Sequence, residues 1–196
     1  MLNNMKNTEE ELEKAVWKLS LPYLKQGRRK DFVIHTKGVI KAAKLLMKKE
    51  AGNKQLVVLA AILHDTGWSK IPIEKQLSNK PEDKLLALHL HIKTALPIAK
   101  EILTKCKLSR TDIKQICAMI FAHKFQNPRD INKRLLIDAD TLSDIFKKQF
   151  YCDAFSYGVS PEKMLEIRGQ NVFYTETAKK IFEKEFKKRE LEILKK

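Results

Sequence analysis

The sequence predicts an all-α protein that forms one helical bundle. Its 196 residues include only six glycines and six prolines, the residues that most often interrupt helices. Apolar residues recur at steps of three and four, which is typical of amphipathic helices, and no segment alternates convincingly as a strand does. No repeat, low-complexity linker or domain boundary is evident, so residues 1–196 are expected to form a single domain.

The first helix is expected over residues 9–20. Asn7 or Thr8 stands in front of it, and either side chain can accept hydrogen bonds from amides that the first turn leaves unpaired. Pro22 should end or kink this helix, because proline has no backbone donor and clashes with the preceding turn. Gly27 should close whatever continues beyond it.

Two helices are expected in the next segment. The helix over 31–50 carries His35 on its apolar face. Four apolar residues share that face: Val39, Ala42, Ala43 and Leu46. The helix over 54–65 is apolar almost all round, which indicates a central, buried position. It ends in the adjacent pair His64 and Asp65.

The stretch 68–81 is expected to be a loop, because prolines and small polar residues punctuate it and no helical period survives. The next helix should start near Pro81. Pro97 should kink this helix or split it into 82–95 and 97–106, since its ring removes one main-chain hydrogen bond.

Cap signals mark two later helices. Ser109, followed three residues on by Asp112, resembles a capping box for a helix over 110–124. Asp130 can cap another helix, which is expected to run to about residue 150.

The last part of the chain is strongly basic. Ser160-Pro161-Glu162 opens a short helix, and an amphipathic, lysine-rich helix is expected over 176–195. The formal net charge is +15, spread along the whole chain, and a field of that sign attracts phosphates of any kind. Lysine-rich solvated helix faces explain the charge without a partner, so it supports an anionic substrate without choosing one.

No segment is expected in a membrane. The longest apolar run, Leu56 to Leu63, is far shorter than the roughly 20 residues that cross a bilayer, and the start lacks a signal peptide's layout. We therefore expect a cytoplasmic protein. The three cysteines never stand in a CxxC spacing, so neither a disulfide framework nor a thiolate zinc site is indicated.

Histidines mark the candidate site. His35, His64 and His123 fall near or on apolar helix faces, where an unpaired imidazole costs free energy. A single such histidine is more often a hydrogen-bonded core residue than a ligand. His64, however, stands beside Asp65, and imidazole and carboxylate together suit first-row divalent metals. The pair is therefore a candidate metal site, although a His-Asp dipeptide also occurs by chance in many proteins of this size.

Three segments carry histidine and aspartate in a distinctive order: VIHTKGVIKAAKLL, LAAILHDTGWSK and LLIDADTLSDI. Over residues 29–146 this order resembles the HD superfamily of metal-dependent phosphohydrolases, and most of all its small stand-alone hydrolases. The resemblance implies an HD-type helical core, with 151–196 as a C-terminal extension. It also implies that one metal ion is held by His35, His64, Asp65 and Asp140.

The resemblance extends to a second metal ion. HLHIKTALPIAKEIL is similar to the corresponding segment of the two-ion members if His91 is the ligand, and His123 matches the next histidine position. Asp65 would then bridge both ions; a core or solvent-facing role for either histidine is the alternative. Lys124 and Phe125 replace the second histidine and the glutamate of the HD-GYP branch, which argues against that branch.

The aspartate of the later helix is ambiguous. Helical periodicity puts Asp138 on the same apolar face as Leu135, Leu142 and Ile145. The family pattern favours Asp140 instead, which follows alanine and precedes leucine by two positions. Asp140 is taken as the ligand and Asp138 as the alternative.

The chemistry implied is hydrolysis of a nucleotide or another small phosphate ester by metal-activated water, with one or two ions of Mn, Fe, Co, Ni or Zn. Asp65 is predicted to be catalytic. Lys70 is the first candidate for a catalytic and substrate-binding cation, and Arg29 or Lys30 is the second. Trp68 is a candidate for stacking on a base or covering the site, with core packing as the alternative.

Two rival functions belong to other classes. One is a regulatory or binding module that keeps the helical scaffold without turnover, although all four core ligands are present. The other is nucleic-acid binding through the basic helix over 176–195, which rests on charge alone. The sequence does not indicate an oligomeric state.

Overall fold

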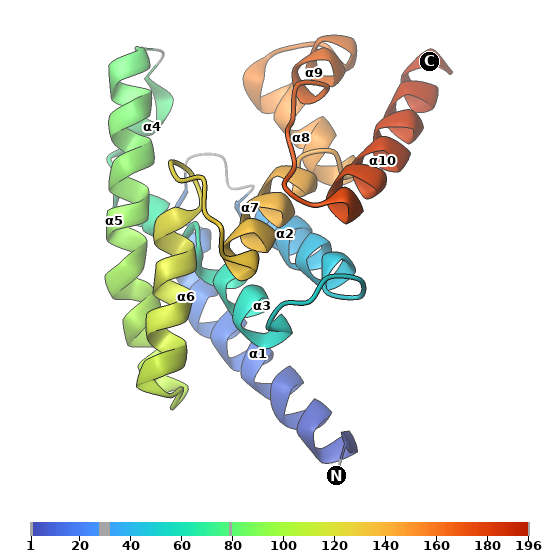
Figure 1. Cartoon of the computed structure of the whole chain (residues 1–196). Coiled ribbons are helices and arrows are strands. Elements are labelled where there is room, and N and C mark those ends of the chain that lie inside the picture. Colours follow the sequence, from blue (N-terminus) through green and yellow to red (C-terminus); the bar gives the residue numbers. More distant parts are fainter. Residues whose placement is uncertain (1, 28–31, 79, 196) are drawn as a thin grey trace.

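The structure, a computed structural model, describes residues 2–27, 32–78 and 80–195. In these residues it has ten α-helices, one 3-10 helix and no strand (Figure 1), so the all-α prediction is confirmed. The helices are α1 (Leu2–Leu24), α2 (Phe32–Leu46), α3 (Lys54–Leu63), η1 (Thr66–Lys70), α4 (Ile73–Leu77), α5 (Pro81–Lys105), α6 (Arg110–Ala122), α7 (Ile131–Ser143), α8 (Lys147–Tyr157), α9 (Pro161–Arg168) and α10 (Glu176–Leu194).

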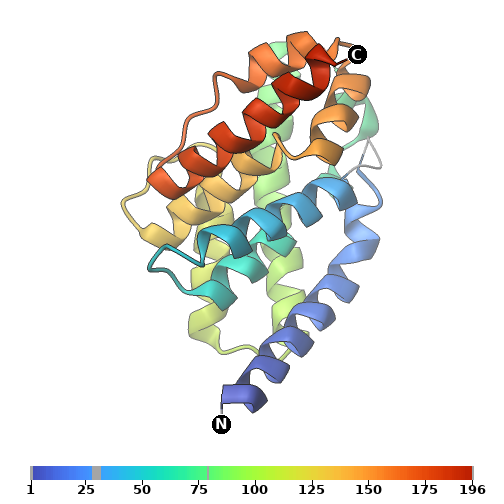
Figure 2. The ribbon, with the colours of Figure 1, turned by 90° about the vertical axis from the view of Figure 1, so that its right-hand side faces the viewer.

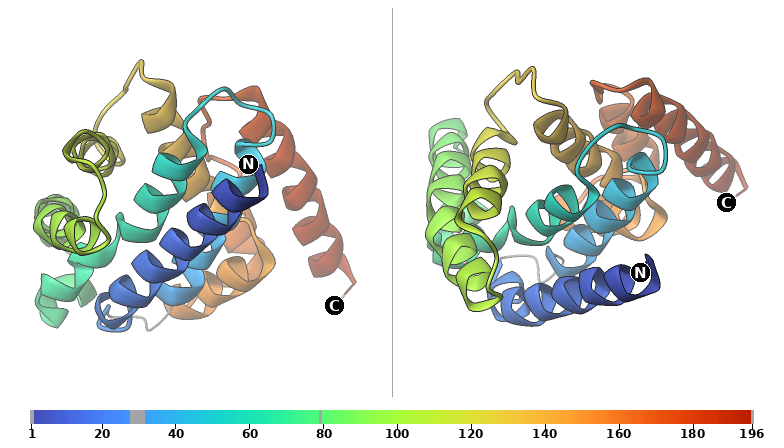
Figure 3. Two further views of the ribbon diagram at one scale, coloured as in Figure 1. Left: turned by 90° about the horizontal axis from the view of Figure 1, so that it is seen from below. Right: turned by 60° about the horizontal axis from the view of Figure 1, so that its bottom comes forward.

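Helix α3 lies at the centre of the bundle, as its sequence predicts. It packs against α1, α2, α6 and α7, and Figure 3 shows it surrounded by these helices. All residues from Leu56 to Leu63 are buried, which accounts for their uniform apolar character. Asn53 caps the helix by accepting a hydrogen bond from the Leu56 amide at 3.2 Å. The C-terminus of α3 therefore brings His64 and Asp65 into the interior.

The other helices surround this centre in three groups. Helices α5 and α6 lie side by side along one flank, and α2 packs along α7 (Figure 1). Helices α8, α9 and α10 gather at one end of the molecule (Figure 2), where α9 packs against both α8 and α10.

The 3-10 helix η1 packs closely against α5, and Gly67 makes this approach possible. A Cβ atom at Gly67 would lie 1.9 Å from the carbonyl oxygen of His91 and 2.6 Å from the amide nitrogen of Ala95. Such distances exclude any side chain. Ala95 is fully buried there, so two small residues bring the loop after Asp65 onto α5.

Several predicted boundaries were wrong at the N-terminal end. Helix α1 starts at Leu2, ahead of the predicted caps Asn7 and Thr8, and it runs through Pro22 to Leu24. The packing of α1 against α3 and η1, which buries Val16 and Leu24, carries the helix through Pro22 despite the weak helix propensity of proline. The expected loop over 68–81 contains part of η1 and the short helix α4, whose Gln76 donates hydrogen bonds to the carbonyls of Trp68 and Ile71.

Two later boundaries also differ. Helix α5 is not split at Pro97, because its packing against η1 and α6 outweighs the lost hydrogen bond. The helix expected over 130–150 is two helices, α7 and α8, with a break after Ser143. The Ser143 hydroxyl donates to the carbonyl of Asp140 at 2.8 Å, and the next three amides bond three residues back, which tightens and ends α7.

No helix in the described ranges is both long and apolar enough to cross a membrane. No disulfide joins the three cysteines, which lie within those ranges.

Candidate metal centre

All six predicted ligand residues converge in the interior from five helices, with His64 and Asp65 both at the end of α3. Their nitrogen and oxygen atoms form two groups, and within each group the atoms lie within 4.8 Å of one another. The first group is His35 of α2, His64 after α3 and Asp140 of α7; the second is Asp65, His91 of α5 and His123 after α6.

The first group is compact. His35 Nε2 lies 3.3 Å from His64 Nε2 and 3.0 Å from Asp140 Oδ1, and His64 Nε2 lies 3.5 Å from the same oxygen. His64 is completely buried and Asp140 nearly so. Two imidazole nitrogens and one carboxylate oxygen therefore face a common point.

The carboxylate of Asp65 lies between the two groups. Its Oδ2 is 3.4 Å from Nε2 of both His35 and His64, and its Oδ1 is 3.6 Å from His91 Nε2. His91 Nε2 is in turn 3.3 Å from His123 Nε2. One oxygen of Asp65 thus serves each group, which is the position of a bridging ligand.

Hydrogen bonds at the far side of the rings set the histidine tautomers. His64 Nδ1 donates to the carbonyl of Ala61 at 2.9 Å, and His123 Nδ1 donates to the carbonyl of Ile120 at 2.6 Å. A carbonyl only accepts, so the proton lies on Nδ1 and the Nε2 lone pair points inward. His35 Nδ1 also carries a proton, because Ser143 uses its only proton on the Asp140 carbonyl and can only accept from His35 Nδ1, so His35 Nε2 is left for a metal ion or a second proton.

This arrangement fits a bound cation. Nε2 atoms 3.3 Å apart, with carboxylate oxygens beside them, need a positive charge between them, which either a metal ion or a proton on one ring supplies. Neutral imidazole and carboxylate are the donor set of first-row divalent ions. The residues present therefore fit two metal ions that share Asp65.

His91 is held by packing on its far side. Its Nδ1 is buried without a hydrogen-bond partner in the described part of the chain. The ring stacks on Trp68, with centroids 4.6 Å apart and planes 10° from parallel. The Trp68 indole N–H donates to Asp65 Oδ1 at 3.2 Å, so the tryptophan orients two of the predicted ligands.

The carboxylates are ionised at neutral pH. Burial alone would raise the pKa of Asp65, but His64, His35 and His91 outweigh it and hold the pKa well below its usual range. Burial would likewise raise the pKa of Asp140, yet the charge of Lys124 and the hydrogen bonds of the histidines keep it far below its usual value.

The histidines divide into two classes. Burial lowers the pKa of His91 to about 4 and that of His123 well below its usual value, and the charge of Lys124 acts in the same direction. His35 is the exception: burial lowers its pKa, but Asp140 and Asp65 outweigh burial and raise it to about 9. Without metal, His35 is therefore protonated and bonded to Asp140.

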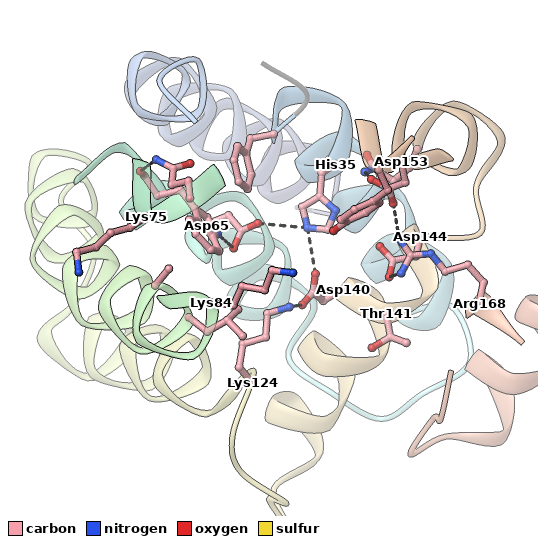
Figure 4. A pocket seen from close by; sticks show the side chains of 17 residues that line it. His35, Asp65, Lys75, Lys84, Lys124, Asp140, Thr141, Asp144, Asp153 and Arg168 are labelled. Carbon is pink, nitrogen blue, oxygen red and sulfur yellow. Dashed lines mark hydrogen bonds and ion pairs between the residues drawn. The ribbon is translucent and has the colours of Figure 1, made fainter. Parts of the chain in front are cut away.

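Lys124 is a site residue whose role the sequence did not reveal. Its Nζ lies 2.5 Å from Asp140 Oδ2. Burial would lower its pKa, but Asp140 and Asp65 raise it above its usual range, so the ammonium persists. Figure 4 shows Lys124 and Lys84 both pointing towards Asp140. The position of Lys124 directly after a predicted ligand was the one available signal.

Lys70 requires a correction. It is exposed at the end of η1, it does not line the cavity of the site, and its charge acts on Glu101 of α5. In a 3-10 helix residues two apart point in different directions, so Trp68 faces the site and Lys70 faces away. The other predicted cations, Arg29 and Lys30, lie outside the described residues.

The structure distinguishes Asp140 from Asp138. Asp138 is fully buried but on another side of α7, where it accepts hydrogen bonds from the amides of Tyr174 and Thr175 and from the Thr175 hydroxyl. The Asp138 carboxylate is therefore bonded to the segment that starts α10. Asp140, two residues further along α7, lies on a different face of the helix and faces the histidines.

A cavity of about 340 Å³ opens onto this site. Asp65, His35, Asp140 and Trp68 line its floor, and Lys84 and Lys124 stand at one side. The opposite side is formed by the end of α7 together with α8 and α9. Its residues are Thr141, Asp144, Gln149, Asp153, Tyr157 and Arg168.

Comparisons with known proteins agree with this architecture. The family model described as the HD domain matches residues 32–145. No curated protein matches the chain. Among solved structures, the chain is similar to a predicted HD superfamily hydrolase from an uncultured Thermotogales bacterium. The TM-score is 0.62 at 20% identity, covering 93% of this chain and 88% of the other.

Proposed function

Because the chain belongs to the HD-domain family, we propose that it is a metal-dependent phosphohydrolase acting on a nucleotide or another small phosphate ester. The observation that carries this proposal is the pair of donor groups that share the carboxylate of Asp65. A purely structural ion pair would not need four imidazoles gathered around two carboxylates, whereas a metal site does need such ligands.

Each residue has a role in this proposal. His35, His64, Asp140 and one oxygen of Asp65 would hold one divalent ion. His91, His123 and the other oxygen of Asp65 would hold a second. When bound, such ions supply an activated water molecule and offset the negative charge that builds on the phosphoryl oxygens.

Lys124 and Lys84 would receive the phosphoryl oxygens in place of Lys70. Both line the cavity beside Asp140, and an ammonium group is a suitable point charge for a phosphate. Lys124 is the stronger of the two, because it is held by Asp140 at the edge of the metal ligands. The volume of the cavity is within the range of small-molecule sites, which supports a small ester as substrate.

Metal analysis and hydrolysis together test the proposal. The protein, purified without a histidine tag, should hold about two ions of Mn, Fe, Co, Ni or Zn per chain and hydrolyse a nucleoside monophosphate or p-nitrophenyl phosphate. Asp65→Ala should remove metal and activity while circular dichroism stays helical. Glu183→Ala, at an exposed carboxylate outside the cavity, is the matched control.

Full metal content without hydrolysis of any phosphate ester would favour the regulatory module instead. Metal content unchanged in Asp65→Ala would show that the ligand assignment is wrong. The cytoplasmic location stays a prediction from the sequence.

A further inference from the structure

The cavity has a second polar region that is separate from the metal ligands. It is formed by Asp144 at the end of α7, by Gln149 and Asp153 of α8, and by Arg168 of α9, and we call these four residues the polar wall. Three of them lie beyond residue 145, where the match to the family ends. Membership of the family therefore says nothing about this wall.

Hydrogen bonds and ion pairs hold the polar wall in one arrangement. Arg168 binds Asp144 Oδ2 at 2.9 Å through one terminal nitrogen and Asp153 Oδ2 through the other. Gln149 Nε2 donates to Asp153 Oδ1 at 2.8 Å. Gln149 is 4% exposed and Asp153 1% exposed, so these side chains are fixed by burial as well as by bonding.

The same network leaves two polar atoms without a partner in the described ranges. One is Gln149 Oε1, an acceptor, and the other is Arg168 Nε, a donor. Buried polar groups are rarely left unsatisfied, and each such exception calls for an explanation. Both residues line the cavity, and the two atoms are covered in the unbound protein, so a ligand with a donor and an acceptor would supply the missing bonds by turning these side chains towards it.

The charge of the polar wall indicates what kind of ligand it takes. Two carboxylates face one guanidinium, so the wall carries a formal excess of negative charge, in contrast to the side with Lys84 and Lys124. A further phosphate would be repelled there. An uncharged group with hydrogen-bonding edges would be accepted.

The spacing also fits one small molecule. Asp144 lies one helical turn beyond Asp140, roughly 6 Å along α7. That separation leaves room for a sugar between a phosphate at the metal ligands and a planar group at the wall. Tyr157 and Phe32, which also line the cavity, provide apolar ring surface for such a group.

We infer that the polar wall is the specificity subsite of the enzyme and binds the base of a nucleoside monophosphate, through Gln149 Oε1 and Arg168 Nε. This inference rests on the proposed function for the identity of the reaction. Binding of the base is independent of the proposed function, because an uncharged nucleoside should bind to the polar wall in the absence of metal.

The first arm of the test measures binding to the metal-free, full-length protein. Calorimetric titration with adenosine, guanosine, cytidine and uridine should reveal at least one ligand, whereas ribose should not bind. Gln149→Met keeps the length of the side chain and removes its amide, both the oxygen and the donor to Asp153, and should weaken that binding by about 10- to 100-fold. Gln170→Met, at an exposed glutamine outside the cavity, should change nothing.

The second arm compares two esters on the metal-loaded enzyme. Gln149→Met should lower kcat/KM for the corresponding nucleoside monophosphate by a similar factor and leave p-nitrophenyl phosphate within about twofold. Arg168→Lys, which keeps the charge between the two carboxylates and removes Nε, provides a second variant if Gln149→Met fails to fold.

The outcomes separate the two proposals. Nucleoside binding without hydrolysis of any ester would overturn the proposed function and support the assignment of the polar wall as the base-binding site. Absence of nucleoside binding, or an equal loss of kcat/KM for both esters, would overturn the proposal that the polar wall binds the base.

Discussion

The carboxylate of Asp138 is bonded to Thr175, a residue 37 positions further along the chain. Oδ2 of Asp138 accepts from both the amide and the hydroxyl of Thr175, at 2.9 and 2.7 Å, and Oδ1 accepts from the amide of Tyr174. Thr175 also caps α10 through a hydrogen bond from the Ala178 amide. The helix that carries Asp140 is thereby attached to the start of the last helix.

Removing this carboxylate should destabilise the fold without removing a metal ligand. In Asp138→Ala three donors lose their acceptor, two of them buried, so the free energy of unfolding should fall by about 3 kcal/mol or more. Urea denaturation measures the loss, and metal content per folded chain should stay at the wild-type value. Loss of metal at unchanged stability would make Asp138 a ligand after all.

Lys124 should matter for turnover and not for metal binding. Lys124→Met keeps most of the stem and removes the charge, and should lower kcat/KM by about 100- to 1000-fold at unchanged metal content. Lys70→Met is the matched control, because Lys70 is exposed and outside the cavity, and should stay within about twofold. The reverse ranking of the two variants would contradict the assignment.

Gly67→Ala should damage the second group of ligands. The added Cβ would meet the His91 carbonyl at 1.9 Å, and neither backbone can yield without separating η1 from α5. We expect a loss of about 3 kcal/mol or more and a metal content reduced by one ion. At Gly169 the nearest atom to an added Cβ is at 3.3 Å, so Gly169→Ala should retain both the stability and the metal.

Metal binding should release a proton from His35. In the metal-free protein its pKa is about 9, because the carboxylates outweigh burial, so an ion must displace a proton below that pH. Calorimetry at pH 7.5 in buffers of different ionisation enthalpy should report about one proton released, and metal affinity should rise from pH 7 to 9. Affinity that is constant over this range would contradict the protonation state.

The same raised pKa has a consequence for the metal-free fold. A histidine whose folded pKa exceeds its unfolded value contributes stability below the unfolded value, and this contribution is lost as pH rises through the folded pKa. The contribution of His35 should therefore be complete below about pH 6.5 and disappear towards pH 9. Thermal melts of wild type and His35→Gln over that range measure it.

Patterns along the chain revealed those features that depend on periodicity and order. The all-round apolar character of 56–63 predicted a central helix, and the order of His35, the His64-Asp65 pair and Asp140 predicted residues that lie together in the structure. Such features can be predicted from the sequence because each depends on the residues of one helix face or one helix end.

Side-chain direction outside regular helices could not be read in the same way. The choice of Lys70 depended on the turn taken after Gly67, which is set by contact with α5. Lys124 and Arg168 enter the cavity because α6 ends and α9 docks where they do, and neither event leaves a periodic pattern. The break between α7 and α8 arises from a hydroxyl that competes for a main-chain carbonyl.

The bond between Asp138 and Thr175 also orders events during synthesis. All six predicted ligands lie between residues 35 and 140 and leave the ribosome before the residues of α9 and α10. Asp138 remains without these partners until Tyr174 and Thr175 emerge, so the helix bearing Asp140 gains these hydrogen bonds only when the C-terminal segment docks. A chain truncated before Tyr174 would therefore keep all six predicted ligands and lack the hydrogen bonds that attach α7 to the C-terminal segment.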